Sequence, residues 1–182
     1  MTRRNWFKAL LLGGPLLGLA GGVALVRSGG YALDPAVGAR LSTLEPWQYI
    51  LVRAVARRMV APDRPDDPGV PTADDAGVAE FVDGYVGRMR PALRRDLLRL
   101  LRYTEQIAPL LGAGLFGRFT ALAAADQDRV LAALETSGID QLRAGFQAMK
   151  SLVMMGYYRD PRIFPVIGYP GPLLAQPARR AP

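Results

Sequence analysis

Residues 91–107 read Pro-Ala-Leu-Arg-Arg-Asp-Leu-Leu-Arg-Leu-Leu-Arg-Tyr-Thr-Glu-Gln-Ile, and they carry the clearest periodicity of the chain. Leu93, Leu97 and Leu101 recur at the spacing that places side chains on one face of an α-helix, while most of the arginines fall on the other face. Pro91 suits the first helical turn, where a missing backbone N–H is tolerated. The stretch therefore predicts an amphipathic helix whose leucines pack into a core.

Four further stretches repeat this helical spacing, and no stretch shows the alternation that is typical of a strand. We expect Thr43, Asp74 or Asp75, and Asp126 to cap three of these helices, and Gly138 to end one of them. The four expected helices span residues 43–59, 74–89, 126–137 and 140–157. The sequence thus predicts an all-α fold with a single small helical domain of about five helices.

Three segments are expected along the chain. They are a signal or membrane-anchor segment (1–32), the helical domain (33–160) and an extended tail rich in Pro and Gly (161–182). Inside the domain, residues 61–77 carry a proline at every third position from Pro62 to Pro71, which a helix does not tolerate. The aspartates of this stretch lack the spacing of a calcium-binding loop, so we expect a solvated loop.

The N-terminus resembles a twin-arginine export signal. Arg3 and Arg4 form the arginine pair, Phe7 and Lys8 follow near the usual apolar and basic positions, and an apolar run of eighteen residues comes next, at 9–26. The resemblance implies export by the twin-arginine translocase and a periplasmic location. Cleavage is expected either near 26–28 or near 30–32. The alternative is an uncleaved anchor in the inner membrane, because eighteen apolar residues come close to spanning a bilayer.

The composition removes much of ordinary enzyme chemistry. The 182 residues include no Cys and no His, which excludes disulfides, Cys nucleophiles, His-ligated metals and Ser-His-Asp catalysis. The net charge of +7 reflects 23 Lys and Arg against 16 Asp and Glu, and residues 1–27 hold four of the basic side chains and no acid. Most of the remaining basic residues alternate with acids along helical stretches, so no nucleic-acid partner is expected. We expect no catalytic, cofactor-binding or metal-binding residue in this chain.

Residues 112–117, Gly-Ala-Gly-Leu-Phe-Gly, match the GxGxxG pattern of dinucleotide-binding folds. In those folds a strand precedes the glycines, and an acid follows on the next strand about 20 residues on. Here a helical stretch precedes the glycines, and Glu135, at the right distance, lies inside an expected helix. The loop is therefore interpreted as a bend between helices that the glycines permit.

The C-terminal stretch alternates large side chains with residues that break helices. Prolines and glycines from Pro161 to Pro172 exclude a helix, and Tyr169-Pro170-Gly171 suits a tight turn. A rigid segment that presents Tyr and Ile has the composition of a contact surface. The alternative, that it folds back onto its own helices, stays open. The residues expected to meet a partner are Tyr157, Tyr158, Phe164, Ile167, Gly168, Tyr169, Pro170 and Gly171.

The same stretch resembles the end of the gluconate 2-dehydrogenase subunit 3 family. The resemblance rests on Gly156-Tyr157-Tyr158, then Asp160-Pro161, then residues 167–172, Ile-Gly-Tyr-Pro-Gly-Pro. The stretches 61–63, Ala-Pro-Asp, and 81–83, Phe-Val-Asp, also fit, as does Phe119 ahead of Asp126-Gln127. One departure is Phe164-Pro165-Val166, where the family would have a turn containing Trp.

The resemblance implies a division of labour. This chain would be a non-catalytic small subunit without a redox centre, which supports the export, folding and stability of a large flavoprotein of the glucose–methanol–choline class. The flavoprotein would bind FAD and oxidise a sugar, sugar acid or alcohol, and a multihaem cytochrome c subunit with haem c would often take the electrons. Two other interpretations are an exported or membrane-anchored helical adaptor unrelated to a dehydrogenase, and an enzyme that acts through residues 112–117.

Overall fold

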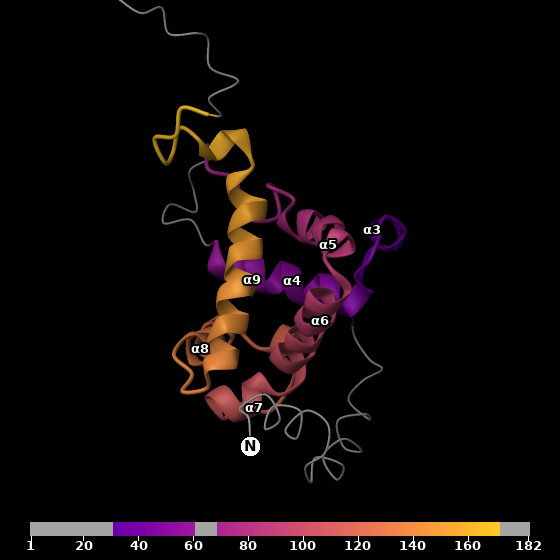
Figure 1. Cartoon of the computed structure of the whole chain (residues 1–182), viewed down its shortest axis with the longest axis vertical. Helices are drawn as coiled ribbons and strands as arrows, with labels where there is room; N and C mark the ends of the chain where they lie inside the picture. Colours follow the sequence, from indigo (N-terminus) through magenta and orange to yellow (C-terminus); the bar gives the residue numbers. More distant parts are fainter. Residues whose placement is uncertain (1–30, 61–68, 172–182) are drawn as a thin grey trace, which may run out of the picture. The chain divides into compact units, whose positions relative to one another are not determined.

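The computed structural model describes residues 31–60 and 69–171 (Figure 1). The described residues from Leu33 onward form one compact unit. The arginine pair and the apolar run of the expected export signal lie outside the described residues. So do residues 61–68 of the proline-rich loop and the last part of the tail, 172–182.

Over 31–60 and 69–171 every regular element is a helix or a 3-10 turn, and there is no strand. This confirms the predicted all-α fold. The five expected helices are the long ones, namely α4 (Pro46–Met59), α5 (Val78–Arg88), α6 (Pro91–Gln106), α8 (Ala124–Glu135) and α9 (Asp140–Tyr158). The additional elements are short: α3 (Pro35–Gly38), α7 (Ala108–Ala113), and the 3-10 turns η1 (Phe119–Ala121) and η2 (Pro161–Ile163).

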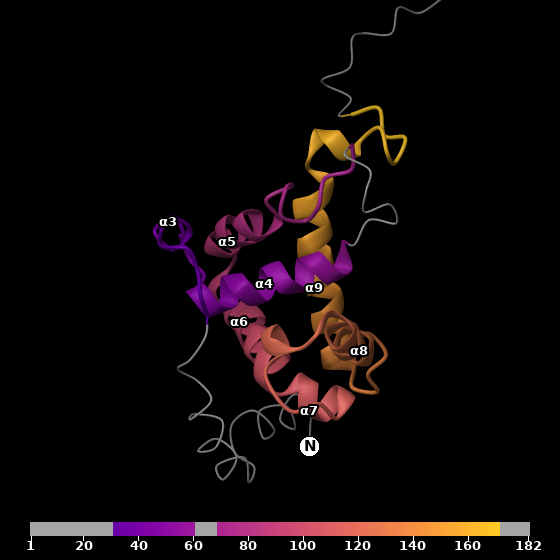
Figure 2. The same ribbon diagram turned by 180° about the vertical axis from the view of Figure 1, so that it is seen from behind.

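Helix α4 lies at the centre of the helical domain. It contacts α5, α6, α8 and α9, and both views show it crossing the long helix α9 (Figures 1 and 2). Leu51 and Val55 of α4 are fully buried, and they share a core with Val86 of α5, Leu101 of α6 and Val153 of α9. The apolar positions with helical spacing in the sequence are thus the positions that build the core.

Helices α5 and α9 approach closely at Gly156. A Cβ atom added there would lie 3.0 Å from Phe81 Cδ1 and 3.4 Å from the Cα atom of Val78. Alanine normally favours a helix over glycine by about 1 kcal/mol, but at this position a methyl group would push the two helices apart. Gly156 is therefore a packing residue between α5 and α9.

The helix ends differ from the predicted caps. Helix α4 begins after a capping box formed by Glu45 and Gln48, two residues later than a cap at Thr43 would place it. Gly77, with a left-handed φ of 60°, precedes α5 in place of an aspartate. Asp126 lies inside the first turn of α8, and that helix ends at Thr136, ahead of the predicted Gly138.

The predicted aspartate cap of α5 was wrong because the side chains of both candidate aspartates have other partners. Asp74 accepts hydrogen bonds from Arg53 and Arg57, each at 2.9 Å. Asp75 closes a turn with Thr72 instead, whose backbone N–H donates to the Asp75 carboxylate at 3.0 Å. A carboxylate that is already bound to a guanidinium or to a local turn is not available to the first backbone N–H groups of a helix.

Candidate functional site

Between the end of α9 and residue 171, the chain forms turns over 159–168, and residues 169–171 have no regular structure. We call residues 161–171 the C-terminal hook. Its first turn, η2, is capped by Asp160, whose carboxylate accepts from the Arg162 backbone N–H at 2.9 Å. The Arg162 guanidinium pairs with Asp160 at 2.6 Å and donates to the Asp75 carbonyl at 2.8 Å. The expected extended tail is thus tied, over 161–168, to the segment that leads into α5.

Two side chains of this region point into the protein. Ile163 is 1% exposed, and Tyr157 is 7% exposed with its hydroxyl donating to the Pro71 carbonyl at 2.9 Å. Burial raises the pKa of the Tyr157 hydroxyl. The structure therefore places Tyr157, which the sequence assigned to a partner interface, in the core. For Tyr157 and Ile163, the alternative that this stretch folds back onto its own helices is therefore correct.

The rest of the hook is held rigid by its own contacts. The Tyr169 backbone N–H donates to the Phe164 carbonyl at 2.8 Å, and the two rings meet edge to face with centroids 5.0 Å apart. Gly168 lies between them with φ of 65°, a left-handed conformation that other residues adopt only with strain. The predicted turn residues Phe164, Gly168 and Tyr169 therefore come together, and they set the shape of the hook.

Five large apolar side chains at this end of α9 and in the hook remain exposed. Three of them, Tyr158, Ile167 and Tyr169, were predicted as partner contacts from the sequence, and they are 46%, 51% and 44% exposed. The other two were missed: Met155 on the last turns of α9 and Val166 in the hook. We call these five residues the hook surface. Pro170 is also exposed beside it, whereas Gly171 is buried.

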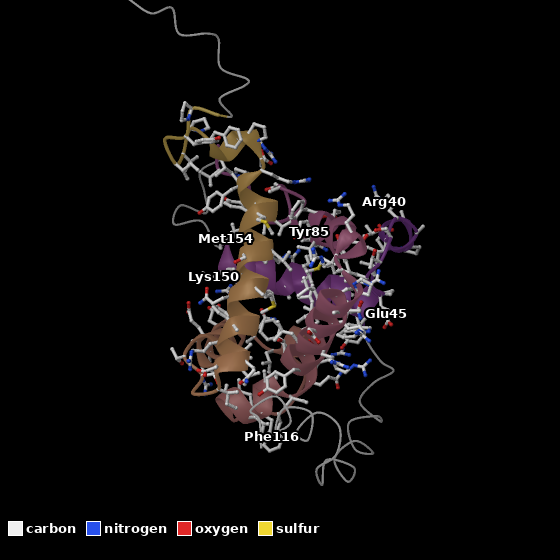
Figure 3. The ribbon with its side chains drawn as sticks, in the orientation of Figure 1. Arg40, Glu45, Tyr85, Phe116, Lys150 and Met154 are labelled. Carbon is white, nitrogen blue, oxygen red and sulfur yellow. The ribbon has the colours of Figure 1, made fainter. Side chains whose placement is uncertain are left out.

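From Gln141 to Tyr158 the exposed face of α9 carries no charged side chain, and the exposed Arg159 follows at the end of the helix. The members of this face are neutral and mostly small: Gln141, Ala144, Gln147, Ala148, Ser151, Met155 and Tyr158. The charges that flank this face are neutralised inside the chain, because Lys150 pairs with Glu135 at 3.2 Å and Arg143 pairs with Asp140. Figure 3 shows Lys150 and Met154 along this helix. Interface centres are depleted of charge but also of Ala and Ser, so on this face only Met155 and Tyr158 have the residue types that are enriched at such centres.

The acidic side chains of the described residues and the GxGxxG match can be located in the structure. Over 31–60 and 69–171 no group of three or more acidic side chains lies close enough to hold a metal ion. Gly112 of the GxGxxG match lies within α7, and Gly114 ends that helix in a left-handed conformation. No strand precedes these glycines in the described part of the chain. A small cavity in the core is lined by apolar side chains only, among them Val52, Leu97 and Met149.

The buried carboxylates serve the fold. Asp83, 5% exposed, accepts from the backbone N–H groups of Ser42, Thr43 and Leu44 at 2.7 to 2.9 Å. Glu105 is fully buried, and it accepts from the Thr120 hydroxyl at 2.7 Å. Each acid thereby fastens a loop to a helix, since a buried carboxylate needs hydrogen-bond donors around it.

None of the helices that the structure describes is long and apolar enough to cross a bilayer. The described residues form a small all-α protein with five large exposed apolar side chains at the end of α9 and in the hook. The family model of gluconate 2-dehydrogenase subunit 3 matches residues 46–171, well over half of the chain, so the chain belongs to that family. The matched region begins at the first residue of α4 and ends with the hook. No curated protein and no solved structure matches the chain. The name of the family indicates that the chain is a subunit of a dehydrogenase complex.

Proposed function

We propose that the chain is a non-catalytic small subunit that binds the large FAD-dependent subunit of a sugar, sugar-acid or alcohol dehydrogenase. The observation that carries the proposal is the hook surface, five exposed apolar side chains on the last turns of α9 and in the hook, in a chain of this family. Monomeric proteins seldom gather exposed apolar side chains without a partner to cover them. The docking site is the hook surface together with the uncharged face of α9.

The size of this surface fits one protein partner. Helix α9 has 19 residues, so it extends about 28 Å at 1.5 Å per residue. A typical interface of about 800 Å² per partner is roughly 30 Å across, which is enough to cover the hook surface and the adjoining half of α9. Because Gly168 and the contact between Phe164 and Tyr169 already fix the hook, little conformational freedom is lost when it docks.

In this proposal the redox chemistry belongs to the partner subunits. FAD lies in the large subunit, which is of the glucose–methanol–choline class, and a multihaem cytochrome c can follow as a third subunit that carries haem c. The small subunit contributes binding, stability and the route of export. Its N-terminal segment carries the folded flavoprotein to the periplasm through the twin-arginine translocase, with or without retention at the inner membrane.

The test is co-expression of the chain with the large subunit, followed by co-purification. Replacing Tyr158, Ile167 and Tyr169 by Ala should reduce the recovery of the large subunit. One interface anchor of this kind contributes on the order of 2 kcal/mol, or ~30-fold in affinity. These side chains are exposed, so the helical content should stay that of the wild type.

The matched control removes exposed apolar side chains from another place. Leu111 is 70% exposed and Phe116 is 88% exposed, and Figure 3 shows Phe116 at the opposite end of α9 from the hook. Replacing these two by Ala should leave co-purification unchanged. Full recovery of the large subunit with the hook variant would contradict the proposed docking site. A wild-type chain that never binds a dehydrogenase would favour the adaptor interpretation.

A further inference from the structure

The solvent side of α6 carries a row of exposed arginines. Arg95, Arg99 and Arg102 follow one another along the helix, and Arg88 and Arg90 lie immediately before its first turn. We call these five residues the arginine face. The single exposed acid of α6, Asp96, pairs with Arg99 at 3.3 Å. The face therefore carries a clear excess of positive charge.

These arginines differ from the other arginines of the domain, most of which have acidic partners. Arg58, for example, pairs with Asp128 at 2.6 Å. Among the described residues, no ion pair joins an acid to Arg88, Arg90, Arg95 or Arg102. No ion pair joins Glu45, at the start of α4 (Figure 3), to these arginines either. Its carboxylate accepts from the Trp47 indole N–H at 2.5 Å. Within 31–60 and 69–171, four of the five arginines of the face thus have no acidic partner that would neutralise their charge.

The arrangement works against the stability of the isolated helix. Arg95 and Arg99 are four residues apart, and Arg99 and Arg102 are three apart, so their like charges repel across single turns. Arg90 is the N-cap residue of α6, and no acid lies in the first turn. Cations at that end oppose the helix dipole. An anionic surface placed against the arginine face would remove both penalties.

We infer that the arginine face docks onto the anionic phospholipid headgroups of a bilayer. Guanidinium groups bind phosphate through two parallel N–H donors, which suits arginine better than a point charge.

Two more observations favour a lipid surface. The sequence itself carries an apolar run at 9–26, flanked by Arg3, Arg4 and Lys8, for which export across a bilayer or retention in one is proposed. The arginine face lies on α6, whereas the hook surface and the uncharged face lie on α9 and beyond it. A bilayer and the large subunit therefore need not compete for the same residues.

The test measures binding of the full chain to two kinds of vesicle. One kind is pure phosphatidylcholine, and the other contains phosphatidylcholine and phosphatidylglycerol in equal parts. The variant replaces Arg95, Arg99 and Arg102 by Gln. The control removes the same charge elsewhere, by replacing the exposed residues Arg40, Arg129 and Arg159 by Gln. The N-terminal segment is the same in all chains, so its own affinity for lipid cancels in the comparison.

The wild type should bind the mixed vesicles more tightly than pure phosphatidylcholine, and added salt should weaken the difference. The variant at 95, 99 and 102 should lose about a hundredfold in affinity for the mixed vesicles, and the control far less. Equal losses in the variant and the control would overturn the inference, because they would show only an effect of net charge. Unchanged vesicle binding together with loss of the large subunit would also overturn it and assign the face to a protein partner. The hook variant tests the dehydrogenase partner separately, so the two ideas fail independently.

Discussion

Single buried side chains fix loops to helices, and Asp83 is the clearest case. Its carboxylate accepts four hydrogen bonds from residues 42–44, including one from the Ser42 hydroxyl at 2.8 Å. In the sequence, Asp83 is distinguished only by the family resemblance of the stretch 81–83. Its physical role, to hold the segment that leads into α4, emerges from contacts between residues about forty positions apart, which no local pattern reveals.

Replacing Asp83 by Asn should destabilise the fold by about 2 kcal/mol at neutral pH, because an amide accepts through one oxygen only and leaves buried donors unpaired. Burial alone would raise the pKa of Asp83, but the hydrogen bonds from Leu44, Ser42 and Thr43 outweigh it and lower the pKa. A lowered carboxyl pKa in the folded state stabilises the protein above the unfolded value, near 4. That stabilisation is lost as pH falls through the lower, folded pKa.

Urea unfolding of the wild type and of Asp83→Asn, measured over a series of pH values, checks this prediction. The difference in unfolding free energy should be largest at neutral pH and should shrink below pH ~4. A difference that stays constant down to strongly acidic pH would show that the carboxylate charge does not matter.

At the scale of elements, helical periodicity predicted the five long helices because each one buries an apolar stripe. The short helices α3 and α7, of four and six residues, were missed because they are too brief to show a period. The hook was predicted only as a Pro/Gly-rich tail, since its shape depends on contacts such as the pairing of Phe164 with Tyr169. Which of its apolar residues point inward could not be read from composition. Ile163 and Ile167 look alike in the sequence, yet one is 1% exposed and the other 51%.

The hook is both a contact surface and a part of the core, and truncation separates these roles. A chain that stops after Arg159 loses Ile163, and the cavity left behind should cost about 3 kcal/mol of stability. A chain that stops after Gly171 keeps the complete hook and should unfold like the wild type. Thermal unfolding of both truncated chains, followed by far-UV circular dichroism, measures the difference. Equal melting temperatures would mean that Ile163 contributes nothing to the core.

At the scale of the whole molecule, the proposal links export to binding. Replacing Arg3 and Arg4 by Lys should leave both this chain and the large subunit in the cytoplasm, because the flavoprotein would travel bound to this chain. The hook variant should give a different result, with this chain exported and the large subunit left behind. Cell fractionation followed by immunoblotting of both subunits distinguishes the two patterns. A large subunit that reaches the periplasm in the arginine-pair variant would contradict shared export.

The docking of a large flavoprotein on α9 and the hook is the central claim, and purification of the tagged chain from its own host tests it most directly. The chain should elute with one large subunit in equal amount. That material should show flavin absorbance and should reduce an electron acceptor when a sugar, sugar acid or alcohol is added. Ala at 158, 167 and 169 should abolish all three signals, whereas Ala at 111 and 116 should preserve them. A chain that elutes alone and without flavin, from cells whose dehydrogenase is active, would contradict the account.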